Sequence, residues 1–140
     1  MPTNNVLFRI QSLKEIENQM NLQAFPAEGL PACKSRVGYE ISHTEEDVSI
    51  KVKTIALYEG KIVMSYAIEG VFGFDEIGKY FDFETNQFTD KVGVLPTLLG
   101  IVIDALRGMQ TLRLTDTPYE AVLPYINPTQ LLEATHAPTK

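Results

Sequence analysis

The sequence contains little reactive chemistry: a single cysteine, Cys33, and two histidines, His43 and His136, among 140 residues. One cysteine forms neither an intramolecular disulfide nor a zinc site, which is typical of a reducing compartment. The simpler interpretation of Cys33 is a small buried side chain in a loop, and a reactive thiol is the alternative. His43 falls in a predicted turn and His136 in the tail, so neither anchors a catalytic mechanism.

Long apolar runs and an excess of positive charge are also missing. No stretch free of charge is longer than residues 92–103, which is shorter than the roughly 20 residues that a membrane-spanning helix needs. The amino terminus has no basic segment followed by an apolar core, so we expect no export signal and a cytoplasmic protein. Twelve Lys and Arg stand against 18 Asp and Glu, a net charge of −6, which argues against nucleic acid or anionic lipid as a partner.

Known catalytic strings are absent: the sequence has no dinucleotide-binding glycine motif, Walker loop, Gly-x-Ser-x-Gly or His-Glu-x-x-His. Residues 82–86 carry oxygen-bearing side chains at alternate positions, as a calcium loop does. Gln87 stands where that loop needs glycine, however, and Gly93 where it needs a closing carboxylate. We therefore predict a solvated loop, no catalytic residues, no metal and no cofactor; an enzyme with a site built from scattered residues is the alternative.

The middle of the chain alternates with a period of two. Apolar side chains at every second position of 37–41 and of 48–52, separated by the polar residues 43–47, predict an antiparallel hairpin. Glu59-Gly60 predicts a tight turn, after which 62–68 alternate again as a third strand. A further strand over about 6–13, resuming near 20–25, precedes a stretch rich in Pro and Gly, so we expect it to cross over and pair beside the last strand.

The apolar spacing becomes helical after Val94. Pro96 suits the first turn, and Gly108 is placed to end the helix. Ile101 and Ile103 occupy the back of this helix, where a lone surface helix would carry charge, so the helix requires cover on a second side. We expect a second subunit there, with cover by the C-terminal segment of the same chain as the alternative. The predicted oligomer interface consists of Leu99, Gly100, Ile103 and Arg107.

The C-terminal region holds two capping patterns, which begin at Thr117-Pro118 and at Asn127-Pro128 and predict two short helices. Residues 1–140 thus form a single α+β domain. The predicted fold is a four-stranded antiparallel sheet, Greek-key-like with a long crossover after its first strand, with a long helix and short C-terminal helices on one face.

Aromatic residues crowd into the segment that follows the third alternating strand. Most are expected to be core or loop anchors; the functional interpretation is that part of this apolar surface forms a groove for an extended peptide. The residues in question are Phe72, Phe74, Tyr80, Phe81, Phe83 and Phe88.

The order of these elements resembles the bacterial export chaperone SecB and its SecB-like relatives. The run Glu69-Gly70-Val71-Phe72-Gly73-Phe74 is similar to the end of that family's fourth strand. Residues 20–26 are similar to the entry into its crossover loop, 94–108 to its first long helix, and 126–132 to the opening of its last helix. The likeness extends over about residues 8–132 and is carried by order and spacing, since no single string is diagnostic.

The resemblance implies a dimer through the main helix, commonly a dimer of dimers, and apolar grooves that hold non-native polypeptides without ATP. Matching positions imply client binding by Leu22, Phe25, Leu30, Leu131 and Leu132. Uncharged Gln19, Gln23 and Ser65 stand where the export chaperone has acidic residues that dock onto SecA, which argues against SecA as a partner. SecB-like relatives also serve the antitoxins of toxin–antitoxin systems.

We therefore expect an ATP-independent, SecB-like chaperone of the cytoplasm, dedicated to export or to an antitoxin, that binds unfolded or extended clients and is not an enzyme. The alternative is a scaffold of the same fold that binds one specific partner and has no general chaperone activity.

Overall fold

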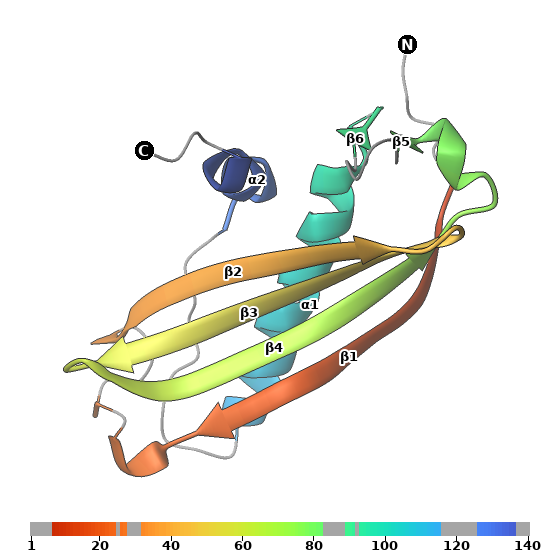
Figure 1. Ribbon diagram of the computed structural model, residues 1–140. Coiled ribbons are helices and arrows are strands. Elements are labelled where there is room, and N and C mark those ends of the chain that lie inside the picture. Colours follow the sequence, from red (N-terminus) through yellow and green to blue (C-terminus); the bar gives the residue numbers. More distant parts are fainter. Residues whose placement is uncertain are drawn as a thin grey trace.

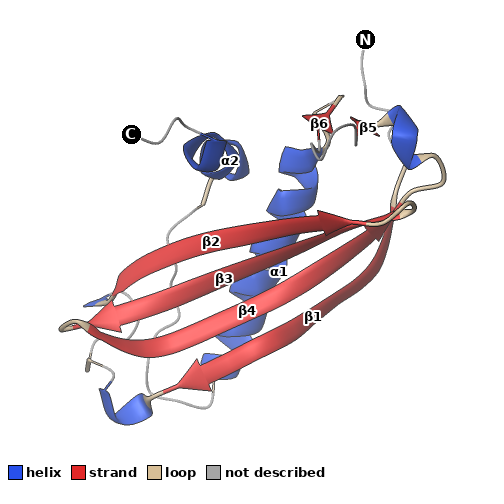
Figure 2. Ribbon diagram, viewed as in Figure 1, coloured by secondary structure: helices blue, strands red, loops and turns tan. Residues whose placement is uncertain are grey.

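The computed structural model describes residues 7–24, 26–27, 32–82, 89–91, 93–115 and 126–136. They form a four-stranded antiparallel sheet with a long helix, α1, across one face (Figures 1 and 2). The strand order is β1-β4-β3-β2, so the predicted fold class and the predicted return of the first strand beside the last are confirmed. The strands are β1 (Arg9–Met20), β2 (Lys34–His43), β3 (Asp47–Tyr58) and β4 (Lys61–Gly73).

Strands β2, β3 and β4 follow one another as the alternating pattern predicts. Val48, Ile50 and Val52 of β3 are wholly buried on the inner face of the sheet, which faces α1. The turn between β3 and β4 has positive φ angles at Glu59 (54°) and Gly60 (79°), the conformation that a two-residue hairpin turn requires and that glycine adopts at no steric cost. The predicted turn at Glu59-Gly60 is therefore confirmed.

Strand β1 differs from the prediction, because it is continuous where we expected a shorter strand that resumes near 20–25. Lys14, Glu15 and Glu17 weaken the strand pattern in the sequence, but β1 lies at the edge of the sheet, where such side chains reach solvent. Its pairing with β4 shifts register between Ile10 and Ser12 and again between Glu15 and Glu17. These bulges let the strand keep its partner through an irregular sequence. A short 3-10 helix, η1 (Leu22–Ala24), follows β1.

Helix α1 (Leu95–Leu114) is longer than predicted, because Gly108 lies inside it. A Cβ added to Gly108 would contact nothing within 4 Å, so this glycine lowers helix propensity without disturbing packing. The start of α1 is capped by Asp90, whose carboxylate accepts hydrogen bonds from the amides of Gly93, Val94 and Leu95 at 2.9, 3.0 and 2.6 Å. Asp90, expected in a solvated loop, therefore holds the helix terminus.

Between β4 and α1 lie a second 3-10 helix, η3 (Ile77–Lys79), and the short paired strands β5 (Phe81–Asp82) and β6 (Thr89–Asp90). Residues 83–88, which include most of the predicted solvated loop at 82–86, lie outside the described residues. Phe72, Phe74 and Phe81 are buried, and Phe74 and Phe81 meet edge-on at 5.4 Å between ring centroids. These three aromatic residues are core anchors, as the simpler interpretation predicts.

Helix α1 lies close against the sheet at Gly70 of β4. A Cβ at this position would lie 2.7 Å from Cγ2 of Val102 and 3.0 Å from Cδ2 of Leu13. Glycine is thus required by the proximity of the helix. The core between the layers is completed by Leu98, Leu99, Val102 and Leu106 of α1, all wholly buried.

Helix α2 (Pro128–His136) packs against α1. Oδ1 of Asn127 accepts a hydrogen bond from the amide of Gln130 at 3.1 Å, so the second predicted capping pattern is confirmed. The first pattern, at Thr117, lies outside the described residues. In the part of the chain that the structure describes, no helix combines the length and the hydrophobicity needed to cross a membrane.

Candidate functional site

Only two of the five predicted client-binding residues have described side chains, and both belong to α2. Leu132 is 9% exposed and forms part of the hydrophobic core, whereas Leu131 is half-buried at its border. Leu22 lies in η1, beyond the end of β1, and its side chain is outside the described part of the chain. Phe25 and Leu30 lie outside the described residues. Of the five, Leu131 is therefore the one with a described apolar side chain that is accessible.

The inner face of β2 provides apolar surface. The alternating pattern of residues 37–41 predicts a strand there but does not indicate a functional role. Helix α1 packs mainly on β3, β4 and β1, so Val37, Tyr39 and Ile41 of β2 are only half-buried. We call these three residues the β2 strip. Strand β2 forms one edge of the sheet, and its pairing with β3 contains no register shift. An extended polypeptide can add to such an edge through its backbone while alternate side chains lie on the strip.

The predicted oligomer-interface residues lie in α1, which α2 contacts. Leu99 and Ile103 are 0% and 2% exposed within the single chain. A Cβ added to Gly100 would lie 3.3 Å from Cγ of Pro128, and Arg107 is half-buried. At Gly100, α2 thus lies against α1, and Ile103 belongs to the core rather than to an open back. Self-association itself stays a prediction.

A different side of α1 is partly exposed. Ile101, Ala105 and Met109 are half-buried, and Leu112 is 71% exposed. With spacings of four, four and three residues, these side chains lie along one stripe of the helix. We call them the α1 stripe; it is apolar along its whole length.

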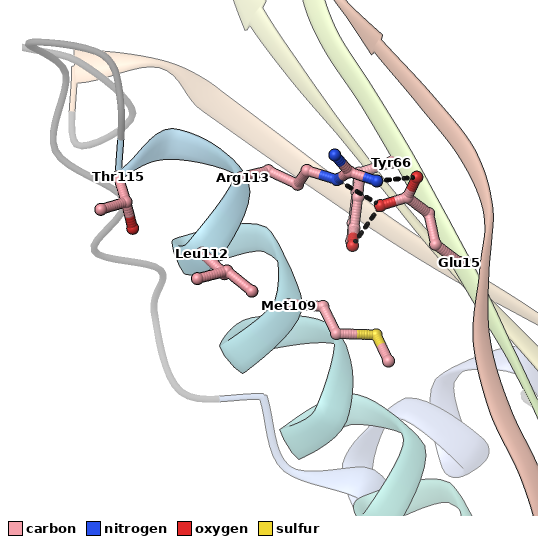
Figure 3. Close-up of a pocket in the computed structure, with 6 residues that line it drawn as sticks. All are labelled: Glu15, Tyr66, Met109, Leu112, Arg113 and Thr115. Atoms are coloured by element: carbon pink, nitrogen blue, oxygen red, sulfur yellow. Dashed lines mark hydrogen bonds and ion pairs between the residues drawn. The ribbon is translucent and has the colours of Figure 1, made fainter.

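A pocket of about 470 Å³ opens at the end of this stripe, between α1 and β1. Its lining residues are Glu15, Tyr66, Met109, Leu112, Arg113 and Thr115 (Figure 3). The guanidinium of Arg113 binds both carboxylate oxygens of Glu15, with Nε–Oε1 and Nη2–Oε2 distances of 2.7 and 2.9 Å. The hydroxyl of Tyr66 donates to Oε1 of Glu15 at 2.9 Å. Glu15 thus ties the last turn of α1 to the edge of the sheet.

The polar groups of this pocket stabilise one another instead of being poised for reaction. The hydrogen bond from Arg113 lowers the pKa of Glu15 despite partial burial. Burial, and then the hydrogen bond to Glu15, raise the pKa of Tyr66 to about 12. A carboxylate with both oxygens engaged and a phenol that keeps its proton are a poor base and a poor acid at neutral pH. Their arrangement is that of a structural ion pair.

Reactive and metal-binding side chains elsewhere in the described residues give no further site. Cys33 is half-buried, and burial raises the pKa of its thiol, which reduces its reactivity. Within the described ranges, no three His, Cys, Asp or Glu side chains are grouped closely enough to hold a metal ion. Ser65 is nearly buried, and its hydroxyl donates to Oε2 of Glu17 at 2.5 Å.

The likeness of this chain to known proteins lies in its structure. No family model and no curated protein matches the chain. Among solved structures, the chain is similar to the SecB-like chaperone Rv1957 of Mycobacterium tuberculosis, solved in complex with a ChAD peptide from the Rv1956 HigA1 antitoxin. The TM-score is 0.52 with 7% identity, and the likeness covers 85% of this chain and 88% of that one. The chain therefore has the fold of a SecB-like chaperone, with a widely divergent sequence.

Proposed function

We propose that the protein is an ATP-independent chaperone that binds extended, non-native polypeptides in the cytoplasm. The observation that carries the proposal is the β2 strip. A half-buried row of Val37, Tyr39 and Ile41 along a regular sheet edge, with which no other described strand pairs, is a surface on which an extended chain can lie. Half-buried Leu131 of α2 supplies further apolar surface. Fold similarity to a chaperone solved with a bound peptide supports the same function.

Suppression of aggregation tests this proposal. A chemically denatured enzyme is diluted into buffer containing the protein at near-stoichiometric ratio, without nucleotide, and light scattering is followed. Scattering should fall strongly. No suppression at a tenfold excess would refute general chaperone activity.

Two pairs of variants locate the surface. Tyr39→Glu places a charge on the β2 strip, and its control, Ser42→Glu, adds the same charge at an exposed position of the same strand. Leu131→Glu and its control Thr129→Glu do the same on α2. The first member of each pair should lose suppression while its control retains it, because a charge desolvated under an apolar client is costly. Thermal unfolding verifies that each variant is folded.

Binding of one dedicated partner is the second candidate function, favoured by the antitoxin peptide in the complex of the similar chaperone. Here the protein would serve one toxin–antitoxin system or one assembly and ignore general clients. Affinity isolation from the native cytoplasm distinguishes the two. One stoichiometric partner would favour the dedicated function, whereas many unrelated proteins would favour the general one.

We also propose that the α1 stripe, rather than the side with Leu99 and Ile103, is covered by a second copy of the chain. The proposal rests on Leu112, 71% exposed at the end of an uninterrupted apolar stripe, since monomers seldom leave such a stripe open. Light scattering after gel filtration should give a dimer or tetramer at micromolar concentration. Leu112→Glu should yield monomers, whereas the neighbouring Thr111→Glu should not; a wild-type monomer would overturn the proposal.

A further inference from the structure

The outer face of the sheet, on the side away from α1, carries an unusual local charge. Strand pairing arranges its side chains in rows across the four strands. In one row Lys51 lies between Glu40 and Glu69, and in the next Lys53 binds Glu17 at 3.2 Å across the small side chain of Ala67. In these two rows each lysine has carboxylates beside it.

The two rows nearest the β3–β4 turn are different. Lys34 pairs with Leu57, which pairs with Ile62; Arg36 pairs with Ile55, which pairs with Ser65. Lys34 and Arg36 are exposed, and neither forms an ion pair with any carboxylate among the described residues. Among the described residues that line the depression around them, Glu59 of the turn is the acidic one. Two cations thus stand over an apolar platform in a protein of net charge −6.

The platform is hollowed and open. A depression of about 500 Å³ is lined by Lys34, Arg36, Leu57, Glu59 and Gly60. Along β2 the next outward position is Gly38, where an added Cβ would contact nothing within 4 Å, and it lines a second depression of about 420 Å³. Glycine inside a strand costs stability and is typical of a place where another backbone approaches. Arg36 of the first depression and Gly38 of the second are successive outward positions of β2. The second depression is also lined by Glu17 and Glu40, which have Lys53 and Lys51 beside them.

We propose that this surface, which we call the outer patch (Lys34, Arg36, Gly38, Ile55, Leu57 and Ile62), binds an extended acidic segment of a partner protein. Lys34 and Arg36 are two positions apart on one strand, about 7 Å in an extended chain, which matches carboxylates at alternate positions of a bound peptide. Apolar residues of the same peptide would lie on Leu57 and Ile62, the latter 55% exposed. Apolar contact and only two unpaired cations favour a peptide over nucleic acid.

This inference goes beyond the proposed chaperone function, because it concerns the opposite face of the sheet and a single class of ligand. The probe is a short fluorescent peptide with two glutamates at alternate positions between leucines, and the comparison peptide has lysines in their place. Fluorescence anisotropy measures binding at low and moderate salt. The glutamate peptide should bind saturably and more weakly as salt rises, and the lysine peptide should not bind.

Two variants localise the binding. Lys34→Glu with Arg36→Glu should raise the Kd about tenfold. The control, Lys79→Glu with Lys91→Glu, makes the same change of charge at exposed sites outside the sheet and should alter the Kd less than about twofold. Gly38→Val should fill the hollow and weaken binding without lowering the melting temperature, since the strand gains a β-branched residue.

Four outcomes would overturn the proposal. They are failure of the glutamate peptide to bind, equal binding of the lysine peptide, equal loss in both double variants, and tighter binding of a single-stranded oligonucleotide at the same residues. None of them bears on aggregation suppression through the β2 strip, so the two proposals fail separately.

Discussion

The contact between Gly70 and α1 allows a quantitative test of the packing described above. In Gly70→Ala the new Cβ would lie 2.7 Å from Cγ2 of Val102, about 1 Å closer than carbon atoms normally approach. Helix and sheet must separate, and overpacking of this kind costs about 1–3 kcal/mol of unfolding free energy. Gly38→Ala is the matched control, because its Cβ meets no atom within 4 Å and loss of glycine flexibility should stabilise by about 0.5–1 kcal/mol.

Urea unfolding followed by circular dichroism measures both changes. A difference of about 3 kcal/mol between the two variants, at an m-value of about 1.5 kcal/mol/M, separates their midpoints by about 2 M. The urea midpoints are measured at several protein concentrations, because a midpoint that changes with concentration reports association as well as folding.

A double-mutant cycle identifies the cause. Val102→Ala removes Cγ2 and leaves a cavity, so it should destabilise the wild-type protein and destabilise Gly70→Ala less or not at all. A midpoint for Gly70→Ala equal to that of the wild type, or additive effects in the cycle, would refute the claimed close approach of helix and strand.

Three further predictions concern titratable groups. Asp90→Ala should lower the unfolding free energy by about 1–2 kcal/mol and Asp90→Asn by less, because the carboxylate caps three amides at the positive end of α1; urea midpoints check the order. The pKa values of Glu15 and Glu17 are lowered by hydrogen bonds from Arg113 and Ser65 respectively. Both carboxylates therefore stabilise the folded protein at pH values above their ordinary pKa near 4.5. This contribution should be lost as the pH falls through their lower pKa values in the folded protein. The double variant with glutamine at both sites should flatten that decline. The pKa of Tyr66 is raised to about 12, so stability should fall as the pH rises from 10 to 12, and Tyr66→Phe should remove that slope.

Much of the sheet could be predicted because its pattern is local. Alternation in β2, β3 and β4 and the Glu59-Gly60 turn specify pairs of neighbouring strands without reference to the rest of the chain. The end of α1 could not be predicted. Gly108 ends a helix only if the residues after it have nothing to pack against, whereas Gln110 and Leu114 of the next turns are buried and continue the helix.

The proposed functional surfaces depend on where α1 crosses the sheet. The spacing of apolar residues along the sequence does not determine that crossing. The pattern of Val37, Tyr39 and Ile41 predicts an inward face; that α1 leaves this face half open depends on the angle at which the helix crosses the sheet. Likewise Glu15 meets Tyr66 and Arg113 over separations of 51 and 98 residues. Ile103 was placed on an open back because α2 could not be positioned from sequence.

The position of β1 has a consequence for how the molecule is made. This strand leaves the ribosome before the other three strands of the sheet, yet its partner β4 runs from Lys61 to Gly73 and is synthesised only after β2 and β3. Nascent β1 must therefore remain unpaired until β4 has been synthesised. During that time the charges of Lys14, Glu15 and Glu17 disfavour its aggregation with other chains. In refolding experiments with pulsed hydrogen exchange, amides of β3 and β4 should gain protection before those of β1, because the local hairpins close shorter loops; simultaneous protection would contradict this order.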